Sequence, residues 1–267
     1  MTDDPAWVER AGCRLRYLRR GPGPVTAALI HELGGGLDSW DGVVAGLPGA
    51  LRLIRYDQRG HGESSCPVAP YALTEHVEDL RAVLDRAAVT APCWLIAAAA
   101  GAAIAVAFAA RYSVRVMGIA MCAPALEVDR ARRGELRSRA DAATRCGMTE
   151  VVDAALARSW PAAERGDGQA FARYRARMLA GDPQGYAFAS RALGDIDLAG
   201  SLAALRCPCL FLAGDHDAVR PPAGVAAQAA RVAHAVFDTV PAGHLMSVQR
   251  PVQVAARVAA FLAEHRS

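Results

Sequence analysis

The stretch Leu95-Ile96-Ala97-Ala98-Ala99-Ala100-Gly101 has the layout of a strand-to-helix elbow with no hydroxyl or thiol at its tip. Residues 93–98 form an apolar run that predicts a buried strand, and residues 101–112 have the apolar content and length of a core-facing helix. In the motif G-x-S-x-G the positions that flank the tip are small, because strand and helix backbones approach closely there. Ala97 and Gly101 meet that requirement. An alanine-rich strand that simply runs into a helix has the same pattern, so the rest of the chain decides.

Strand-like runs alternate with helical ones on both sides of this elbow. The expected strands are residues 13–19, 25–31, 51–56, 93–98, 116–122, 209–213 and 235–240. The expected helices are residues 39–47, 73–87, 101–112, 222–233 and 252–265. This alternation predicts an α/β fold with a mostly parallel, doubly wound sheet, whose site lies at the carboxyl ends of the strands.

The alternation stops between Pro124 and Cys207. We expect residues 126–200 to form a helical lid, inserted between the core segments 1–125 and 201–267. The aromatic and sulfur side chains of this segment either pack the lid or line a substrate pocket, and Trp160, Tyr174 and Met178 are the candidates for substrate binding. Its arginines suit a carboxylate-bearing substrate or are ordinary solvated helix residues. They are Arg130, Arg132, Arg133, Arg137, Arg139 and Arg145.

Length and charge favour a single-domain enzyme that acts on small molecules. The chain has 267 residues, of which 53% are hydrophobic, so one α/β domain with an insertion can bury its core. The formal charge of +3 indicates neither a nucleic-acid stripe nor an acidic tail. The segment 1–5 lacks a basic region followed by an apolar stretch, and no run is long enough to span a bilayer. We expect a cytoplasmic monomer or homodimer with a small-molecule substrate and no contact with nucleic acid or membrane.

The seven cysteines are scattered mostly through apolar segments, and we expect them to be reduced, buried thiols. Cys207-Pro208-Cys209 is too tight for a zinc knuckle, and no second cysteine pair completes four ligands. No metal is therefore expected. As replacement nucleophiles, Cys122 is a buried thiol with little reactivity, and Cys93 lies at the wrong edge of the sheet.

A glycine-rich loop, Leu29-Ile30-His31-Glu32-Leu33-Gly34-Gly35-Gly36, follows the second expected strand. Such a loop can direct an N–H group at a developing oxyanion, beside the N–H of the residue after the elbow tip. The two donors would be Leu33 and Ala100. Glu32 is either a second acid or base beside this oxyanion hole, or a loop carboxylate that faces solvent or pairs with an arginine.

Asp57-Gln58-Arg59-Gly60-His61-Gly62-Glu63-Ser64 follows the next strand. This pattern predicts a tight turn with an Arg and an Asp able to pair across it. We interpret its charged residues as scaffold and expect His61 to take no part in chemistry.

Two further strand ends carry a carboxylate and an imidazole. Phe211-Leu212-Ala213-Gly214-Asp215-His216-Asp217 ends one strand, and Val240-Pro241-Ala242-Gly243-His244 ends the last. The chain order elbow, Asp, His matches the order of a hydrolase triad on such a sheet. Asp217 would orient His244 and favour its charged form, and Glu127 is the substitute if Asp217 points elsewhere.

With these segments in place, the chain resembles the α/β-hydrolase superfamily over almost its full length, and within it the lid-bearing enzymes of the 3-oxoadipate enol-lactonase type. The resemblance implies the α/β-hydrolase fold, with Ala99 at the nucleophile position, Asp217 as the acid, His244 as the base, and Leu33 and Ala100 as oxyanion donors. It implies neither an organic cofactor nor a metal. Two departures are the missing serine at position 99 and Glu32 in place of the glycine usual after the loop histidine.

Three explanations of the missing nucleophile stay open. In the first, which we favour, His244 held by Asp217 is a general base on a lactone, ester or β-dicarbonyl substrate, without covalent catalysis. In the second, an original serine at position 99 has been replaced by alanine. In the third, the protein binds a small ligand without converting it.

Overall fold

The computed structural model describes residues 5–166 and 168–265. Its centre is an eight-stranded sheet with the order β1-β2-β4-β3-β5-β6-β7-β8. The strands are β1 (Pro5–Arg10), β2 (Cys13–Arg20), β3 (Val25–Ile30), β4 (Leu51–Tyr56), β5 (Cys93–Ala98), β6 (Val116–Cys122), β7 (Cys209–Gly214) and β8 (Ala235–Val240). The pairs β1–β2 and β2–β4 are antiparallel, while the pairs among β3 to β8 are parallel. The expected mostly parallel sheet is confirmed.

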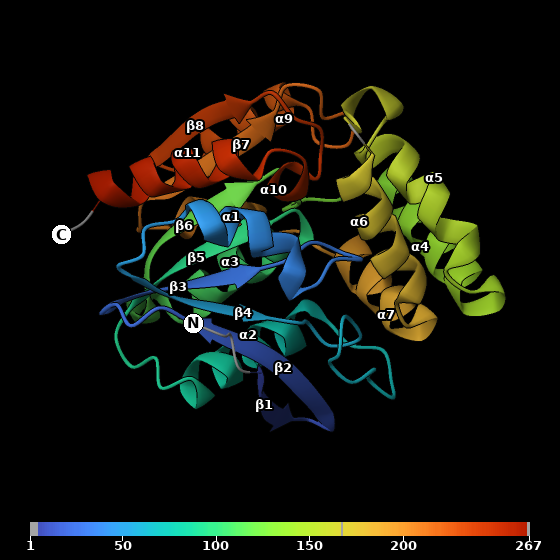
Figure 1. Cartoon of the computed structure of the whole chain (residues 1–267), viewed down its shortest axis with the longest axis horizontal. Coiled ribbons are helices and arrows are strands. Elements are labelled where there is room, and N and C mark those ends of the chain that lie inside the picture. The colour runs from blue at the N-terminus through green and yellow to red at the C-terminus, as the bar shows by residue number, and fades with distance from the viewer. Residues whose placement is uncertain (1–4, 167, 266–267) are drawn as a thin grey trace.

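Helices cover both faces of the sheet (Figure 1). One face carries α2 (Leu73–Arg86), α3 (Ala100–Arg111), α8 (Ala199–Ala204) and α9 (Pro222–Ala229). The other carries α1 (Asp41–Gly46), which follows the 3-10 turn η1 (Leu37–Trp40), together with α10 (Met246–Gln249) and α11 (Pro251–Glu264). Within β3, Ala28 and Ile30 join the first apolar cluster and Ala27 and Leu29 the second. The two-residue period of a strand thus supplies both halves of the core.

Five α-helices lie between β6 and β7 in the described part of the chain; α8 packs on the sheet, and we call the other four the insertion. They are α4 (Arg130–Cys146), α5 (Thr149–Ser159), α6 (Gln169–Ala180) and α7 (Pro183–Gly194). They gather at one end of the sheet, at the right of Figure 1. Their shared apolar cluster includes Leu245 of the core, and Leu33 packs against it. The insertion therefore packs against the core through apolar contacts at this end of the sheet.

A buried carboxylate adds a polar connection between the insertion and the core. Glu164 belongs to the 3-10 turn η3 (Ala162–Glu164), after α5. Its Oε1 lies 2.5 Å from Nδ1 of His216, and its Oε2 accepts a hydrogen bond of 3.1 Å from Arg250. Both partners belong to the core. A buried carboxylate with two such partners fixes the position of its own segment.

The turn after β4 is held differently from expectation. Arg59 does not pair with Asp57 but makes a double ion pair with Asp79 of α2, at 2.6 and 2.7 Å. Asp57 instead accepts hydrogen bonds from the amides of Leu37 (2.8 Å) and Glu63 (3.1 Å). The predicted pair between Arg59 and Asp57 is wrong, because the side chain of Arg59 extends to the neighbouring helix α2 and binds Asp79 there.

The structure also differs from the sequence-based expectation at the edge strand β1 and at three of the seven cysteines. The edge strand β1 was not expected, because its half-exposed residues show no apolar run. All seven cysteines are free, but only four are buried; Cys66 and Cys207 are partly exposed and Cys146 is exposed. No helix in the described part of the chain combines the length and apolar character that a membrane crossing requires.

Candidate active site

The elbow is a strained turn between β5 and α3. Ala99 has φ 45° and ψ −110°, a conformation that L-residues rarely adopt. At Gly101 an added Cβ would lie 2.4 Å from the carbonyl oxygen of Ile30, so any side chain there would clash with β3. The chain thus makes the sharp turn of a nucleophile elbow, with a methyl group at its tip.

An imidazole and a carboxylate meet beside this turn. Nδ1 of His244, after β8, lies 2.8 Å from Oδ2 of Asp217, after β7. Oδ1 of Asp217 accepts hydrogen bonds from the amides of Val219 (2.7 Å) and Arg220 (2.9 Å). Because the Asp217 side chain is fully buried and has both oxygens occupied, its orientation is fixed. The remaining ring nitrogen of His244, Nε2, is then the one available for chemistry.

Two amides near Ala99 have no acceptor. In the loop after β3, the amide of Gly34 donates to Nε2 of His61 (3.1 Å) and that of Gly35 to the carbonyl of Glu32 (3.0 Å). The amide of Leu33 donates to no described residue, and neither does that of Ala100, the first residue of α3. Unpaired N–H groups of this kind are what an oxyanion hole requires.

Two buried histidines hold the glycine-rich loop after β3 in place. Nε2 of His31 accepts a hydrogen bond from the amide of Gln58 (2.9 Å), and its Nδ1 lies 2.8 Å from the carbonyl of Glu32. His61 has the same arrangement, with Nδ1 3.2 Å from the carbonyl of Arg59. One acceptor and one donor per ring require the neutral form. Burial accordingly lowers the pKa of His31 and lowers that of His61 to about 4.

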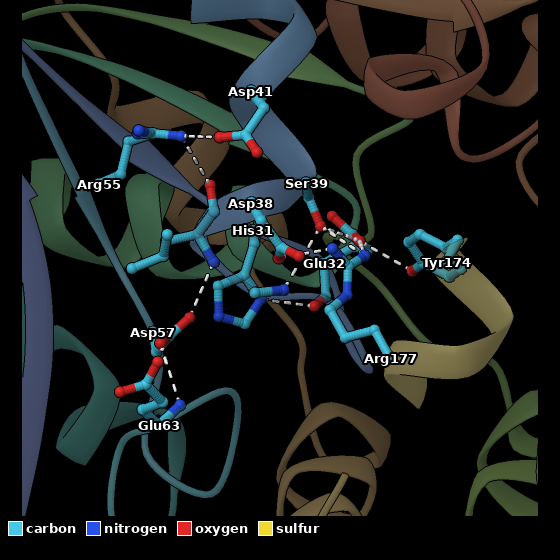
Figure 2. Close-up of polar contacts among 12 residues, drawn as sticks. His31, Glu32, Asp38, Ser39, Asp41, Arg55, Asp57, Glu63, Tyr174 and Arg177 are labelled. Carbon is cyan, nitrogen blue, oxygen red and sulfur yellow. Dashed lines mark hydrogen bonds and ion pairs between the residues drawn. The ribbon is translucent and has the colours of Figure 1, made fainter. Parts of the chain in front are cut away.

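Glu32 does not face solvent; its side chain is buried. Figure 2 shows its carboxylate among Ser39, Tyr174 and Arg177. Oε1 accepts hydrogen bonds from the hydroxyls of Ser39 and Tyr174, both 2.8 Å, and lies 3.9 Å from Nη2 of Arg177. Oε2 is buried and has no hydrogen-bond partner among the described residues. One oxygen of Glu32 is thus fixed and the other is unused.

These groups surround one cavity of about 470 Å³ between the core and the insertion. Its wall includes Glu32, Leu33, Ala99, Ala100, Tyr174, Met178, Tyr186, His244, Leu245, Arg132, Arg139, Arg158 and Arg220. Asp217 lies behind His244. Trp160 is not part of the wall: it donates from Nε1 to the carbonyl of Glu164 (3.0 Å) and stacks edge-on against Phe171 and Tyr174. The structure therefore places Trp160 in the packing of the insertion.

Two residues of this region were not singled out from the sequence. Arg220 follows Asp217 by three positions and lines the cavity, and its proximity to the carboxylate was the available signal. Ser39 donates to Glu32, but nothing in the local pattern marks a serine at the start of a helix as part of a site.

The alternative site residues lie apart from this arrangement. Glu127 pairs with Arg231 at the surface. Burial raises the pKa of the Cys122 thiol to about 12, so it stays protonated at neutral pH. Among the described residues, no three His, Cys, Asp or Glu side chains are grouped so as to hold a metal ion.

Residues 50–242 match the protein family described as Hydrolase_4: serine aminopeptidase, S33. The chain is 25% identical over 225 residues to 3-oxoadipate enol-lactonase 2 of Acinetobacter baylyi, covering 83% of this chain and 82% of that protein.

Solved structures of hydrolases are also similar to this chain over almost its full length. An enol-lactonase from Burkholderia xenovorans is 27% identical, with a TM-score of 0.91, and the match covers 97% of this chain and 100% of that one. A hydrolase from Pseudomonas aeruginosa has the same identity and TM-score, with 97% and 98% covered. The expected α/β-hydrolase fold is confirmed by these matches.

Proposed function

We propose that this chain, which belongs to the Hydrolase_4 family, hydrolyses a small ester or lactone by general base catalysis. The proposed reaction forms no covalent intermediate and uses no cofactor. The observation that carries the proposal is the convergence on one cavity of His244, the unpaired amides of Leu33 and Ala100, and the methyl group of Ala99. Enol-lactonase and hydrolase relatives support the ester or lactone class. A β-dicarbonyl substrate is the variant of the same chemistry in which a C–C bond breaks.

The reaction begins with water, because position 99 has no nucleophile. Nε2 of His244 takes a proton from the water as its oxygen attacks the carbonyl carbon, and Asp217 stabilises the imidazolium that forms. The carbonyl oxygen becomes an oxyanion, which the amides of Leu33 and Ala100 bind. The oxyanion collapses, the bond to the leaving oxygen breaks, and His244 returns its proton to that oxygen. Ala99 contributes space for the water.

Glu32 is the second polar group that we assign to this reaction. Glu32 is part of the cavity wall, its Oε1 is fixed by Ser39 and Tyr174, and its Oε2 is buried without a hydrogen-bond partner among the described residues. A rotation of the carboxylate that exposes Oε2 to the cavity would let it accept a hydrogen bond from the attacking water. Arg177, at 3.9 Å, offsets the repulsion between this carboxylate and the oxyanion. A Glu32→Gln variant removes the charge while it keeps an oxygen acceptor, and we expect a lower kcat with little change in KM.

We propose that the insertion is the lid of this cavity, since Tyr174, Met178 and Tyr186 of α6 and α7 form part of its wall. With Ala99 and Ala100 on the opposite side, the lid excludes bulk water from the oxyanion and so strengthens its hydrogen bonds.

The test is hydrolysis of a panel of aryl esters and lactones by the His244→Ala variant, with His234→Ala, an exposed histidine outside the cavity, as the matched control. We expect kcat to fall about 100- to 10,000-fold in His244→Ala, the usual contribution of a general base, and to stay unchanged in the control. Mass spectrometry of the wild-type protein during turnover should show no acyl adduct. Unchanged turnover by His244→Ala, or an acyl adduct on the wild-type chain, would eliminate this mechanism.

A further inference from the structure

Two arginines in the wall of the cavity have no partner. Arg139 lies on α4 of the insertion, and Arg220 lies in the loop that carries Asp217. Neither guanidinium makes a hydrogen bond or an ion pair with any residue that the structure describes, and the Nε atom of each is buried. Both side chains belong to residues that are only partly exposed.

Other buried arginines of this chain are compensated by carboxylates. Arg59 is paired with Asp79 at 2.6 Å, and Arg177 with Asp38 at 2.5 Å. Burial lowers the pKa of each guanidinium, but Asp79 raises that of Arg59 further than burial lowers it, and Tyr174, Glu32 and Asp38 together do the same for Arg177. A buried cation is ordinarily held in this way, because removing it from water is costly unless an opposite charge is near.

Arg139 and Arg220 show the opposite behaviour. Burial lowers the pKa of both guanidinium groups, and Arg132 lowers each further by repulsion. Both stay charged at neutral pH, since an arginine does not lose its proton in proteins. Glu135 acts on Arg139, and Asp217 on Arg220, only from a distance, so the fold holds two desolvated positive charges at the cavity with no carboxylate of a described residue in direct contact.

The carboxylates of the cavity wall are engaged elsewhere. Glu135 accepts hydrogen bonds from Arg132 (2.5 Å) and Arg158 (3.1 Å). Glu32 is bound by Ser39 and Tyr174, as described above. The wall thus keeps an excess of positive charge, and that excess lies at Arg139 and Arg220.

We propose that Arg139 and Arg220 bind a carboxylate of the substrate that does not react, so that the substrate class is an anionic ester or lactone. The inference rests on the proposed function, because it concerns the occupant of the same cavity. A guanidinium matches a carboxylate with two parallel hydrogen bonds, which orients the bound molecule.

The positions of the two arginines add a consequence for the reaction. The amide of Arg220 donates to Oδ1 of Asp217 at 2.9 Å, so an anion bound to Arg220 is fixed relative to the dyad. Arg139 belongs to the insertion. A carboxylate held by both therefore aligns the reacting carbonyl and draws the insertion onto the core, and a neutral substrate gains neither effect.

The test compares two esters of equal chain length, mono-p-nitrophenyl adipate, which is charged, and p-nitrophenyl hexanoate, which is neutral. We expect the wild-type protein to prefer the charged ester in kcat/KM, and Arg139→Leu and Arg220→Leu each to reduce that preference about 10- to 100-fold, the usual effect of losing a hydrogen-bonded charge. The control is Arg137→Leu on the same helix, whose exposed side chain pairs with Asp195 at 3.3 Å. It should leave the preference unchanged. Equal losses on both esters, or no wild-type preference, would overturn the proposal.

A binding measurement separates this inference from the proposed function. Isothermal calorimetry with the adipate dianion, against 1,6-hexanediol as the neutral counterpart, requires no turnover. Adipate binding that both variants weaken supports the arginine site even if no ester is hydrolysed, whereas ester turnover with no adipate binding supports the function and contradicts the site. If Arg139→Leu does not fold, Arg139→Gln replaces it, because its amide keeps a polar group at the cavity wall.

Discussion

The hydroxyl of Tyr174 donates a hydrogen bond of 2.8 Å to Oε1 of Glu32, although 142 residues separate the two in the chain. Tyr174 lies on α6 of the insertion, and Glu32 follows β3 of the core (Figure 2). Both side chains are buried. This bond joins the insertion to the loop after β3, together with the ion pair between Arg177 and Glu32, and it helps to fix a carboxylate of the cavity wall.

Removal of this hydroxyl should destabilise the protein. In Tyr174→Phe, Oε1 of Glu32 loses one of its two hydrogen bonds, and we expect the free energy of unfolding to fall by about 1.5–3 kcal/mol, the usual value for a bond to a charged group. The control is Tyr71→Phe, since the Tyr71 hydroxyl is buried and has no described partner. Urea denaturation measures both. Equal effects of the two substitutions would contradict the importance of the Glu32 bond.

The strained backbone at position 99 leads to a second prediction. Ala99 holds φ 45°, which costs about 1–3 kcal/mol for a residue with a Cβ, whereas glycine adopts it freely. Ala99→Gly should therefore stabilise the fold by about 1 kcal/mol after the larger chain entropy of unfolded glycine is subtracted. Chemical denaturation provides the measurement, with Ala107→Gly in the middle of α3 as the destabilising control. A lower free energy of unfolding in Ala99→Gly would show that the turn is not strained.

A serine at the same position should restore covalent chemistry. The side chain of Ala99→Ser would start at the tip of the elbow, in the cavity that His244 and the free amides of Leu33 and Ala100 also line. With p-nitrophenyl acetate we expect a burst of p-nitrophenol and an acyl adduct in the mass spectrum. Both should vanish in the double variant Ala99→Ser/His244→Ala. A single variant without a burst would mean that the elbow does not present residue 99 to the dyad.

His61 should make the stability depend on pH. Its pKa in the folded protein is about 4, below the ordinary value of 6.5, so the unfolded chain binds more protons between these values. The free energy of unfolding should be fully maintained above pH 6.5 and fall as the pH drops toward 4, by up to about 3 kcal/mol for this residue. The lowered pKa values of His31 and His76 act in the same direction.

Comparison with His61→Gln isolates that contribution. Glutamine can keep an acceptor for the amide of Gly34 and has no proton to gain, so the slope of the unfolding free energy against pH should decrease by up to about 1.4 kcal/mol per pH unit between pH 4 and 6.5. His234→Gln, at an exposed position, is the control. Identical slopes in the wild type and in His61→Gln would refute the assignment.

The contact of Glu164 with the core should matter for the insertion. Glu164→Gln weakens the bonds to His216 and Arg250, and we expect a loss of about 1 kcal/mol, which corresponds to a fall in Tm of about 2–4 °C for a chain of this size. Glu150→Gln, an exposed residue of α5, is the control. Differential scanning calorimetry in low and high salt checks the effect. An unaltered Tm would mean that the apolar cluster alone holds the insertion.

Much of the fold was predictable because it depends on local patterns. Apolar runs marked seven of the eight strands, since a strand of a parallel sheet is buried on both faces. The edge strand β1 was not predicted because its residues are half-exposed, and its position depends on its pairing with β2 and on the ion pair between Arg10 and Asp79. The alternation of strands with helices then fixed which chain segments end at the same edge of the sheet.

The candidate site was predictable only in part. Asp217 and His244 stand directly after strands, so topology alone brings them to one edge, and the structure gives the 2.8 Å between them. The environment of Glu32 was not predictable, because its partners Ser39 and Tyr174 come from other elements. The same holds for Arg59, whose partner Asp79 lies on the helix beneath it rather than across the turn.

Three features could be derived from the amino-acid sequence alone: the order of the elements, the elbow with alanine at its tip, and the strand ends that carry Asp217 and His244. These follow from periodicity and from the size limits of a sharp turn, which act over a few residues. The packing of the whole chain then leaves several polar groups of the site without a partner among the described residues: Oε2 of Glu32, the amides of Leu33 and Ala100, and the guanidinium groups of Arg139 and Arg220. The reason is that a hydrogen bond or an ion pair depends on side chains far apart in the chain, whose distances are set only when the sheet and the insertion pack together.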